Sequence, residues 1–466
     1  MITKIFACIF LAFGMCEGST ASDICISGIR ISGNKQTKDF TIMRELPFRT
    51  GDVMPEDRLI YQLTVATEHL NNTSLFNYVY MDYIPDTLER TDCLSCIVTI
   101  HVEERWYYWP QVSIKFEDRN LSAWLHEKKF NRITIGWGMR IYNVFGMRHK
   151  ITLSDYFGYE KGGRLGYSNI ALDKKRTQLL SFSFNALFNK TINTSSSNDK
   201  VIYVKDPNRF LESSVEGSIN YSYRPGIRMM HSFDAGYGRV RLGDTVLMLN
   251  KDYWGTDNLV NNTFRFSYNY SYEHRDYIVY PTKGYYISSG VTGVTADKMR
   301  FFYGELDLKL QYYGEFFPRW FWSSRLNGGA SFKNKRAYIY DCHVGYEDRY
   351  ITGYDYYVVD GQHYALLNND LRFLIMPKRI FNLGPTNNLA KFTKIHFTIY
   401  AKLMYDAGYV HNSYRSESNR LANTFLWGSG IGIDIVTYYD IVLGASYAIN
   451  KMGEKGFYFG IKAPVF

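Results

Sequence analysis

Cysteines are the residues whose spacing most directly suggests chemistry in this sequence. Cys93 and Cys96 form a Cys-x-x-Cys pair, and Cys25 and Cys342 lie elsewhere in the chain. Such a pair can bind zinc or exchange disulfides, but a zinc site needs two further Cys or His ligands at a similar spacing. The sequence offers no second pair and no neighbouring pair of His. A disulfide formed in an oxidising compartment explains the pair better, and the pairing stays open: Cys93 with Cys96, or either of them with Cys25.

Charged side chains that could act as acids or bases lack the surroundings of a catalytic site. Glu305, Asp307 and Lys309 alternate along one segment, and the His residues are scattered. The chain has no G-x-S-x-G elbow, no H-E-x-x-H motif and no phosphate-binding loop. The sequence therefore predicts no enzyme, no metal and no cofactor, and it indicates that these charges form a solvated lining.

The segments that carry these charges alternate apolar and polar residues. In "RITIGWGMRI" (132–141), Trp137 and its apolar neighbours occupy every second position. The same holds for 303–312, where leucines alternate with the charges, and for 396–406, where Asp406 lies on the polar side. A period of two is typical of β-strands, since successive side chains point to opposite faces.

Composition indicates an exported membrane protein built from strands. Residues 1–21 resemble a secretory signal peptide, and no later run reaches the roughly 18 apolar residues of a membrane helix. Aromatic residues make up 17% of the chain, with 41 Tyr against 11 Pro. The net charge of +9 includes no dense basic run, which argues against nucleic-acid binding. A barrel in the outer membrane of a Gram-negative bacterium fits these features.

Strand-like segments recur about sixteen times within residues 105–466, the even number expected of a bacterial antiparallel barrel. We expect apolar side chains to face lipid and polar ones to face a wet lumen, since a closed barrel pairs its whole backbone. The predicted strands lie near 110–117, 130–141, 147–157, 162–170, 176–188, 211–224, 227–239, 262–273, 284–294, 301–313, 319–332, 363–376, 395–406, 423–437, 441–449 and 456–465.

The connections between these segments differ in length, as in a barrel with short inner turns and long outer loops. The short connections include 224–227 and 316–319. One inner connection is unexpectedly long, at 377–394. The long outer connections lie at 189–210, 240–261 and 333–362.

Residues 22–104 are organised differently and predict a small α+β domain of order β-α-α-β-β. Its second helix places Leu59, Leu63, Ala66 and Leu70 on one stripe. The motifs "IRISGNKQT", "REL", "GD" and "LFNYV" occur in the order and spacing of the polypeptide-transport-associated (POTRA) domain, which this region resembles. The resemblance implies a periplasmic module that holds unfolded clients and partners, partly by adding a strand to a sheet edge.

The barrel resembles the BamA/TamA superfamily of outer-membrane assembly and translocation proteins, and with the POTRA region the likeness covers nearly the whole chain after the signal. "HRDYIVYPTKG" (274–284) is similar to the family's R-D-x(4)-P-x-x-G turn. Arg275 and Asp276 are then expected at the periplasmic rim. Pro281 presets a turn, and Gly284 can adopt a positive φ.

A second motif, "ITGYDYY" (351–357), resembles the V-R-G-[FY] motif of the family's sixth outer loop through Gly353, Tyr354 and Asp355. In the family this loop folds into the lumen, and its Arg pairs with an Asp on a later strand. "LMYDAGYV" (403–410) resembles that later motif and assigns the role to Asp406, followed by Gly408. Thr352 occupies the Arg position here. Three alternatives stay open: Arg349 substitutes, Asp406 is hydrated, or the loop is held differently.

The C-terminal segment "GFYFGIKAPVF" resembles the family's last strand, which ends in an aromatic residue, here Phe466. Pro464 removes a backbone donor from this strand, and the first strand, from Pro110, is short. A weakly paired seam between the first and last strands is what a lateral gate requires.

Two functions compete on this evidence. In the first, the POTRA domain receives unfolded outer-membrane or exported clients, with periplasmic chaperones or lipoproteins as further partners, and the seam opens to insert or translocate them. In the second, the chain is a passive pore or structural barrel of the same architecture. The Thr352 substitution and the single POTRA domain favour the second function, and the retained turn motif, Asp406 and the POTRA motifs favour the first.

Overall fold

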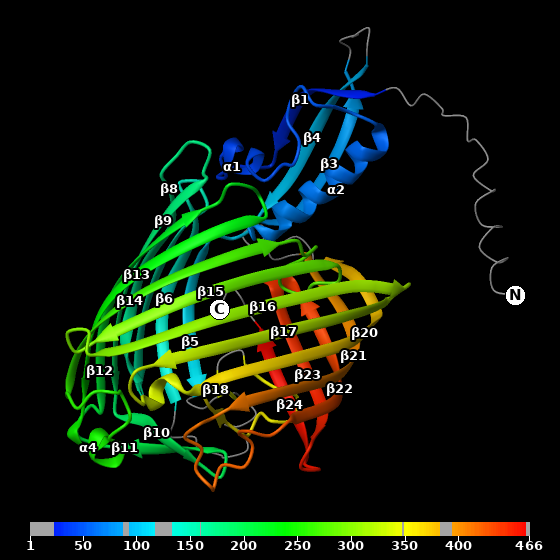
Figure 1. Cartoon of the computed structure of the whole chain (residues 1–466). Helices are drawn as coiled ribbons and strands as arrows, with labels where there is room; N and C mark the ends of the chain where they lie inside the picture. Colours follow the sequence, from blue (N-terminus) through cyan, green and yellow to red (C-terminus); the bar gives the residue numbers. More distant parts are fainter. Residues whose placement is uncertain are drawn as a thin grey trace, which may run out of the picture.

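The computed structural model describes residues 23–86, 93–116, 133–158, 160–346, 349–382 and 394–462. The expected signal segment (1–21) and Phe466 lie outside these ranges. A small N-terminal domain is followed by a large sheet that curves around an interior, and the domain lies at one end of it (Figure 1). Within the described ranges, no helix is both long enough and apolar enough to cross a membrane.

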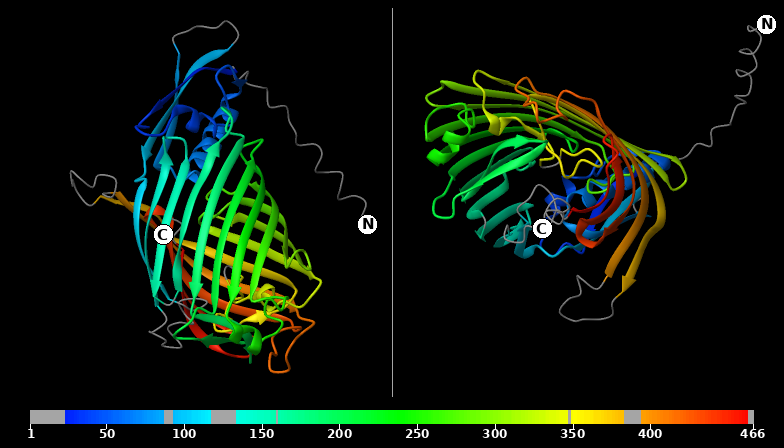
Figure 2. Two further views of the ribbon diagram at one scale, coloured as in Figure 1. Left: turned by 90° about the vertical axis from the view of Figure 1, so that its left-hand side faces the viewer. Right: turned by 90° about the horizontal axis from the view of Figure 1, so that it is seen from below.

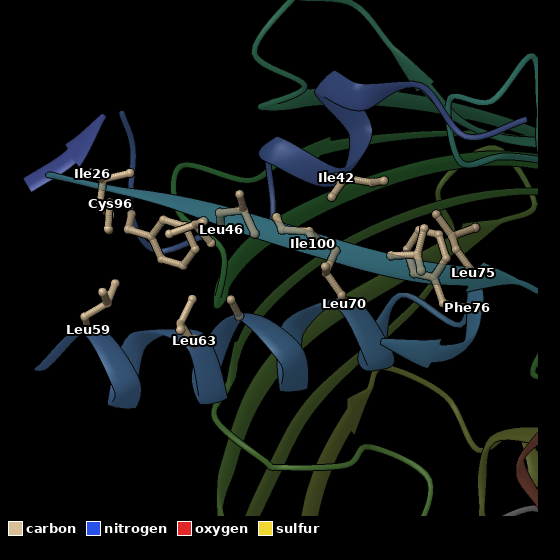
Figure 3. Close-up of a cluster of buried hydrophobic side chains, with 14 of the residues drawn as sticks. Ile26, Ile42, Leu46, Leu59, Leu63, Leu70, Leu75, Phe76, Cys96 and Ile100 are labelled. Atoms are coloured by element: carbon tan, nitrogen blue, oxygen red, sulfur yellow. The ribbon is translucent and has the colours of Figure 1, made fainter. Parts of the chain in front are cut away.

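The N-terminal domain has a four-stranded sheet covered by helices. The strand order is β2-β1-β4-β3, with β1 and β4 parallel and the other pairs antiparallel. Its elements are β1 (Ile24–Ser32), α1 (Asp39–Met43), β2 (Val53–Met54), α2 (Glu56–Asn72), β3 (Phe76–Pro85) and β4 (Leu94–Glu104). The predicted stripe of α2 packs on the sheet, where Leu59 and Leu70 are fully buried (Figure 3). The expected β-α-α-β-β order is confirmed, with the short β2 added between the helices.

Sixteen antiparallel strands form the barrel sheet, as the sequence predicts. Each pairs with the sheet strands that precede and follow it, except that β5 and β24, at the two ends of the order, have one neighbour each within the described ranges. The strands are β5 (Tyr108–Phe116), β6 (Ile133–Val144), β7 (His149–Gly158), β8 (Glu160–Ala171), β9 (Gln178–Asn189), β12 (Glu212–Tyr223), β13 (Met229–Leu242), β14 (Val260–Glu273), β15 (Gly284–Ala296), β16 (Phe301–Phe317), β17 (Trp320–Lys333), β20 (His363–Asn382), β21 (Lys394–His411), β22 (Leu426–Thr437), β23 (Ile441–Asn450) and β24 (Lys455–Lys462).

The two faces of this sheet differ as the alternation predicts. Trp137 is 52% exposed and Leu306 is 47% exposed on the outer face. On the inner face, Asp406 is 5% exposed. A continuous apolar outer face of this extent would be unusual for a protein surrounded by water, and it suits contact with lipid.

The long connections gather at the end of the barrel opposite the N-terminal domain (Figure 1). They contain the hairpin β10 (Thr191–Ser197) and β11 (Lys200–Lys205), α4 (Asp244–Leu249), η1 (Tyr338–Tyr340), β18 (Cys342–Val344) and β19 (Val359–Asp360). Short turns face the N-terminal domain, among them η3 (Tyr438–Asp440) between β22 and β23. We call the end of the barrel that faces the N-terminal domain the near mouth.

The extent expected for the long inner connection, 377–394, is wrong, because the strands on either side of it are longer than predicted. β20 continues to Asn382, and β21 already begins at Lys394. Two register shifts, between Leu374 and Met376 and between Met376 and Arg379, let pairing continue past Pro377, which has no N–H to donate. Residues 383–393 lie outside the described ranges.

Candidate functional site

The loop between β17 and β20 returns into the barrel and binds the predicted acid. The Thr352 hydroxyl donates to Oδ2 of Asp406 at 2.6 Å, and the Thr352 backbone N–H donates to the same oxygen at 2.9 Å. The backbone N–H of Asn369 donates to Oδ1 at 3.2 Å. Hydrogen bonds to a carboxylate stabilise its charged form, so these donors serve where the resemblance leads one to expect a guanidinium. Of the three alternatives given for Asp406, these contacts support the third, in which the loop is held differently.

Arg349 does not replace the missing loop arginine. Its guanidinium lies 3.5 Å from Glu305 and 3.9 Å from Asp307, both on β16. It also contacts Nδ1 of His343 at 2.9 Å. Within the described ranges its acidic partners are therefore on β16, not on β21 where Asp406 lies. The substitution hypothesis is wrong because the side chain extends to a different strand.

The loop motif packs closely because glycines leave room for it. A Cβ on Gly428 of β22 would lie 1.7 Å from the carbonyl oxygen of Thr352, and one on Gly408 would lie 2.5 Å from Ile351. Gly353 has a φ of +84°, which favours glycine. The sequence analysis did not identify Gly428, although an inward glycine within a strand is a known sign of close backbone approach.

The remaining motif residues fix the loop against the last strands. Tyr354 is buried, and its hydroxyl donates to the carbonyl of Trp427 at 3.3 Å. The carbonyl of Gly353 accepts from the side chain of Asn450 at 2.9 Å and from the Tyr458 hydroxyl of β24 at 3.4 Å. Asp355 is half-buried and lines the same cavity as Tyr458. The loop thus contacts the strand at the edge of the sheet.

The motif at 274–284 forms the turn between β14 and β15 at the near mouth, and its four predicted residues, Arg275, Asp276, Pro281 and Gly284, lie together there. Asp276 Oδ1 accepts the backbone N–H groups of Tyr277 at 2.8 Å and Thr282 at 2.9 Å. Arg275 pairs with Glu273 on β14. Gly284 has a φ of +101°, and a Cβ there would lie 1.9 Å from the carbonyl of His274.

This turn also inserts Tyr280 into the lumen, which the sequence analysis did not foresee. The buried Tyr280 hydroxyl donates to Asp434 at 3.0 Å, and the guanidinium of Arg372 lies 4.6 Å from the ring centre. Arg372 also donates to the carbonyl of Pro281 at 3.0 Å and pairs with Asp370 at 3.1 Å. The only sign of this insertion in the sequence was an aromatic residue directly before the proline of the turn.

The turn and the loop approach each other inside the barrel. A cavity of about 290 Å³ is lined both by Tyr280 of the turn and by Thr352 of the loop. A larger cavity of about 920 Å³ extends along the loop motif to β24. The turn therefore narrows the lumen from the near mouth, and the loop narrows it from the opposite end.

Buried charges attach the N-terminal domain to the near mouth. Glu45, after α1, pairs with Arg224 at 2.6 Å and with Arg148 at 3.2 Å, and both arginines belong to barrel turns. Burial alone would raise the pKa of Glu45, but these arginines lower it to about 2. The carboxylate is therefore charged at neutral pH.

A second attachment lies beside the turn between β14 and β15. Arg105, directly after β4, donates to the two oxygens of Asp440 at 2.6 and 3.1 Å, and the Tyr277 hydroxyl donates to the same carboxylate. Asn72 of α2 donates to the backbone carbonyls of Arg275 and Asp276, each at 3.2 Å. The domain thus contacts the turn that inserts Tyr280.

The seam of the barrel lies between its first and last strands. β5 and β24 form the two edges of the sheet, and no register joins them within the described ranges. Seen from below, the red end of the sheet turns toward the interior (Figure 2). Phe457, Phe459 and Ile461 of β24 are all more than half exposed.

The cysteines resolve the pairing that the sequence left open. Cys25 and Cys93 form a disulfide, which joins β1 to the start of β4. Cys96 is buried and Cys342 is half-buried, and both are free thiols. The Cys-x-x-Cys spacing is therefore not the bonded pair.

Comparisons with known proteins match both parts of the chain. The POTRA family, described as "Surface antigen variable number repeat", matches residues 24–105. BamA from Haemophilus ducreyi lacking POTRA domains 1–3 superposes with a TM-score of 0.52 at 14% identity, over 94% of this chain and 84% of that one. CdiB from Escherichia coli superposes with a TM-score of 0.53 at 12% identity, over 94% and 76%. No curated protein sequence matches the chain. The resemblance inferred from the motifs is confirmed in the fold.

Proposed function

Because the chain has the BamA/TamA-type architecture of a POTRA domain and a sixteen-stranded barrel, we propose that it inserts or translocates client proteins at the outer membrane. The apolar outer face supports the membrane location, which puts the POTRA domain and the near mouth in the periplasm. The alternation that exposes Trp137 on the outer face and buries Asp406 on the inner face agrees with this placement.

The observation that carries the proposal is the unjoined seam between β5 and β24. A strand edge in hydrocarbon leaves backbone N–H and C=O groups without partners, which costs several kcal/mol per group. An added client strand would satisfy these groups by β-augmentation. The seam can therefore act as a lateral gate at which client strands pair with β24 or β5.

The POTRA domain offers a second edge for clients. β3 lies at the end of its sheet order, and Tyr80 on this strand is exposed. An exposed edge strand is a template for an incoming extended segment. Clients, or the chaperones and lipoproteins that deliver them, would bind there before they reach the barrel.

Disulfide locking of the seam tests the gate. Val112→Cys on β5 would be combined in turn with Phe457→Cys, Phe459→Cys and Ile461→Cys on β24, in a background with Cys96→Ala and Cys342→Ala. All four positions have exposed side chains. We expect that oxidation of a cross-linking pair stops client assembly and that reduction restores it, measured as outer-membrane protein levels after depletion of the native chain.

A matched control places the same Phe457→Cys opposite Tyr447→Cys on β23, where the two residues are already register partners. This lock should leave assembly intact. Unchanged client levels after both depletion and seam locking would exclude the gate. A steady open conductance in a planar bilayer would instead favour the passive pore, although the turn and loop that narrow the lumen argue against one.

A further inference from the structure

A cavity of about 420 Å³ lies at the near mouth between the POTRA domain and the barrel. His69 and Asn72 of α2 line one side of it. Ser271 of β14 and Tyr286 of β15 line the other side, and both lie on the inward face of the barrel sheet. Ser271 is five positions along β14 from Phe266, whose exposed side chain points outward, so the two side chains point to opposite faces. The cavity therefore opens to the aqueous periplasm and lumen rather than to lipid.

One buried cation in this cavity makes no ion pair within the described ranges, although the nearby charge of Glu45 acts to raise its pKa. Arg176, in the turn between β8 and β9, is 7% exposed, and its Nη2 donates to the carbonyl of Met147. Its Nη1 has no hydrogen-bond partner within the described ranges. Glu45 is already engaged by Arg224 and Arg148. Leaving a buried charged donor unsatisfied is costly, so the site is suited to an incoming anion.

The electrostatic surroundings of Arg176 agree with this reading. Burial, and then the neighbouring charge of Arg148, lower the pKa of Arg176 to about 10. An anion in the cavity would stabilise both guanidinium groups. The side chain remains charged at neutral pH, so it can bind an anion without a prior proton transfer.

The lining combines five arginines (Arg148, Arg176, Arg224, Arg228 and Arg275) and three glutamates (Glu45, Glu68 and Glu273) with an apolar part, and this apolar part specifies the ligand further. Leu179, Ile227, Met229 and Met230 line the cavity beside Arg176. Methionine side chains adapt to different apolar groups. The ligand that fits is a carboxylate attached to an apolar segment, as in an unfolded polypeptide.

We propose that this cavity, which we call the Arg176 pocket, binds a carboxylate of a client polypeptide as the client passes from the POTRA domain to the barrel. The inference rests on the proposed client-handling function. The carboxylate is either the C-terminus of the client or an Asp or Glu side chain next to apolar residues. The pocket would hold a segment of the client at the near mouth while its strands reach the seam.

The test uses the full chain in detergent and three fluorescein-labelled peptides of one alternating apolar and polar sequence. One ends in a free carboxylate, one ends in an amide, and one ends in an amide but carries an internal Asp. We expect at least one carboxylate peptide to bind about tenfold tighter than the plain amide, a difference of ~1.4 kcal/mol, in fluorescence anisotropy. The peptide that shows this preference identifies the source of the carboxylate.

Variants connect the preference to the pocket. Arg176→Gln should abolish it and Arg176→Lys should retain part of it, whereas Arg241→Gln, an exposed arginine of β13, should leave it unchanged. In the native chain the preference should also shrink between about 0.05 and 1 M salt, which tests the charge without a substitution. Equal binding of all three peptides, no binding of any, or a preference that survives Arg176→Gln would overturn the inference.

The outcome is separable from that of the proposed function. A seam-locked chain should keep the carboxylate preference, because the pocket lies on the near mouth and not on the β5 and β24 edges. A chain that shows the preference but assembles no client would contradict the proposed function alone. Displacement of the peptide by phosphatidylglycerol micelles in an Arg176-dependent manner would assign the pocket to a lipid headgroup and overturn the peptide assignment.

Discussion

At the scale of single residues, the contact between Thr352 and Asp406 shows how one substitution changes a motif without removing its contact. A hydroxyl and a backbone N–H hold the carboxylate where the resemblance leads one to expect a guanidinium. A neutral hydroxyl supplies a hydrogen bond but no compensating charge. The buried carboxylate therefore depends on the number of its donors rather than on an ion pair.

Thr352→Val keeps the shape of the side chain and removes its donor. We expect it to weaken loop packing by about 1–3 kcal/mol, the cost of removing one partner from a buried polar group. The readout is the rate at which an added protease cleaves the loop at 334–362 in folded barrels. Thr352→Ser retains the hydroxyl and is the matched control. Equal cleavage of the two variants would show that the hydroxyl does not hold the loop.

At the scale of elements, short turns of the barrel connect the N-terminal domain to the lumen. The turn between β12 and β13 supplies Arg224 to Glu45, and the turn between β14 and β15 contacts Asn72 while it inserts Tyr280. A movement of α2 would therefore shift the side chain of Tyr280 inside the barrel. The charge on Glu45 makes the first of these contacts dependent on pH.

The docking of the domain should weaken in acid. The pKa of Glu45 is lowered from 4.5 to about 2 in the docked state. A depressed pKa stabilises docking fully above the undocked pKa, and this stabilisation is lost as the pH falls from about 4.5 to 2. Docking should thus be constant from pH 6 to 8, and its loss in acid should be on the order of 3 kcal/mol.

Spin labels at exposed Tyr61 of α2 and exposed Phe316 near the end of β16 would report docking as a distance. Glu45→Gln should broaden this distance at pH 7 as acid does in the native chain, because it removes the charge. Asp57→Asn, an exposed acid of the same domain, should leave it narrow. A distance that stays narrow in Glu45→Gln would show that the charge does not hold the domain.

At the scale of the whole molecule, buried contacts attach the N-terminal domain to the near mouth, while no register joins β5 to β24 within the described ranges. Asp440 is central to the attachment, because it accepts from Arg105 of the POTRA boundary and from Tyr277 of the inserted turn. Burial would raise the pKa of Asp440, but Arg105 lowers it, so the pair is ionised. This pair joins three segments that lie far apart in the sequence.

Asp440→Asn would leave the buried guanidinium of Arg105 without its carboxylate. Breaking a buried pair from one side typically costs about 3–5 kcal/mol, so we expect the POTRA domain to detach. Trypsin should then cleave after Arg105, which is buried in the native chain, and release the domain from an intact barrel. Asp257→Asn, an exposed acid of a distant loop, should not sensitise this bond. Continued protection in Asp440→Asn would mean that other contacts hold the domain.

The sequence by itself determined the architecture and the faces of the strands. Alternation placed Trp137 outward and Asp406 inward, because side-chain direction in a strand follows from position alone. The turn motif likewise predicted Gly284, whose positive φ is a local property of the backbone.

Only the tertiary structure decided which groups meet. Glu45 and Arg224 are 179 residues apart, Tyr280 and Asp434 are 154 residues apart, and Cys93 bonds to the distant Cys25 rather than to Cys96 of the Cys-x-x-Cys pair. The extent of β20 past Pro377 also depended on bulges formed with its partner. A local pattern fixes the direction of a side chain, but the partner it finds depends on register and curvature across many strands, and these are set only when the whole sheet forms.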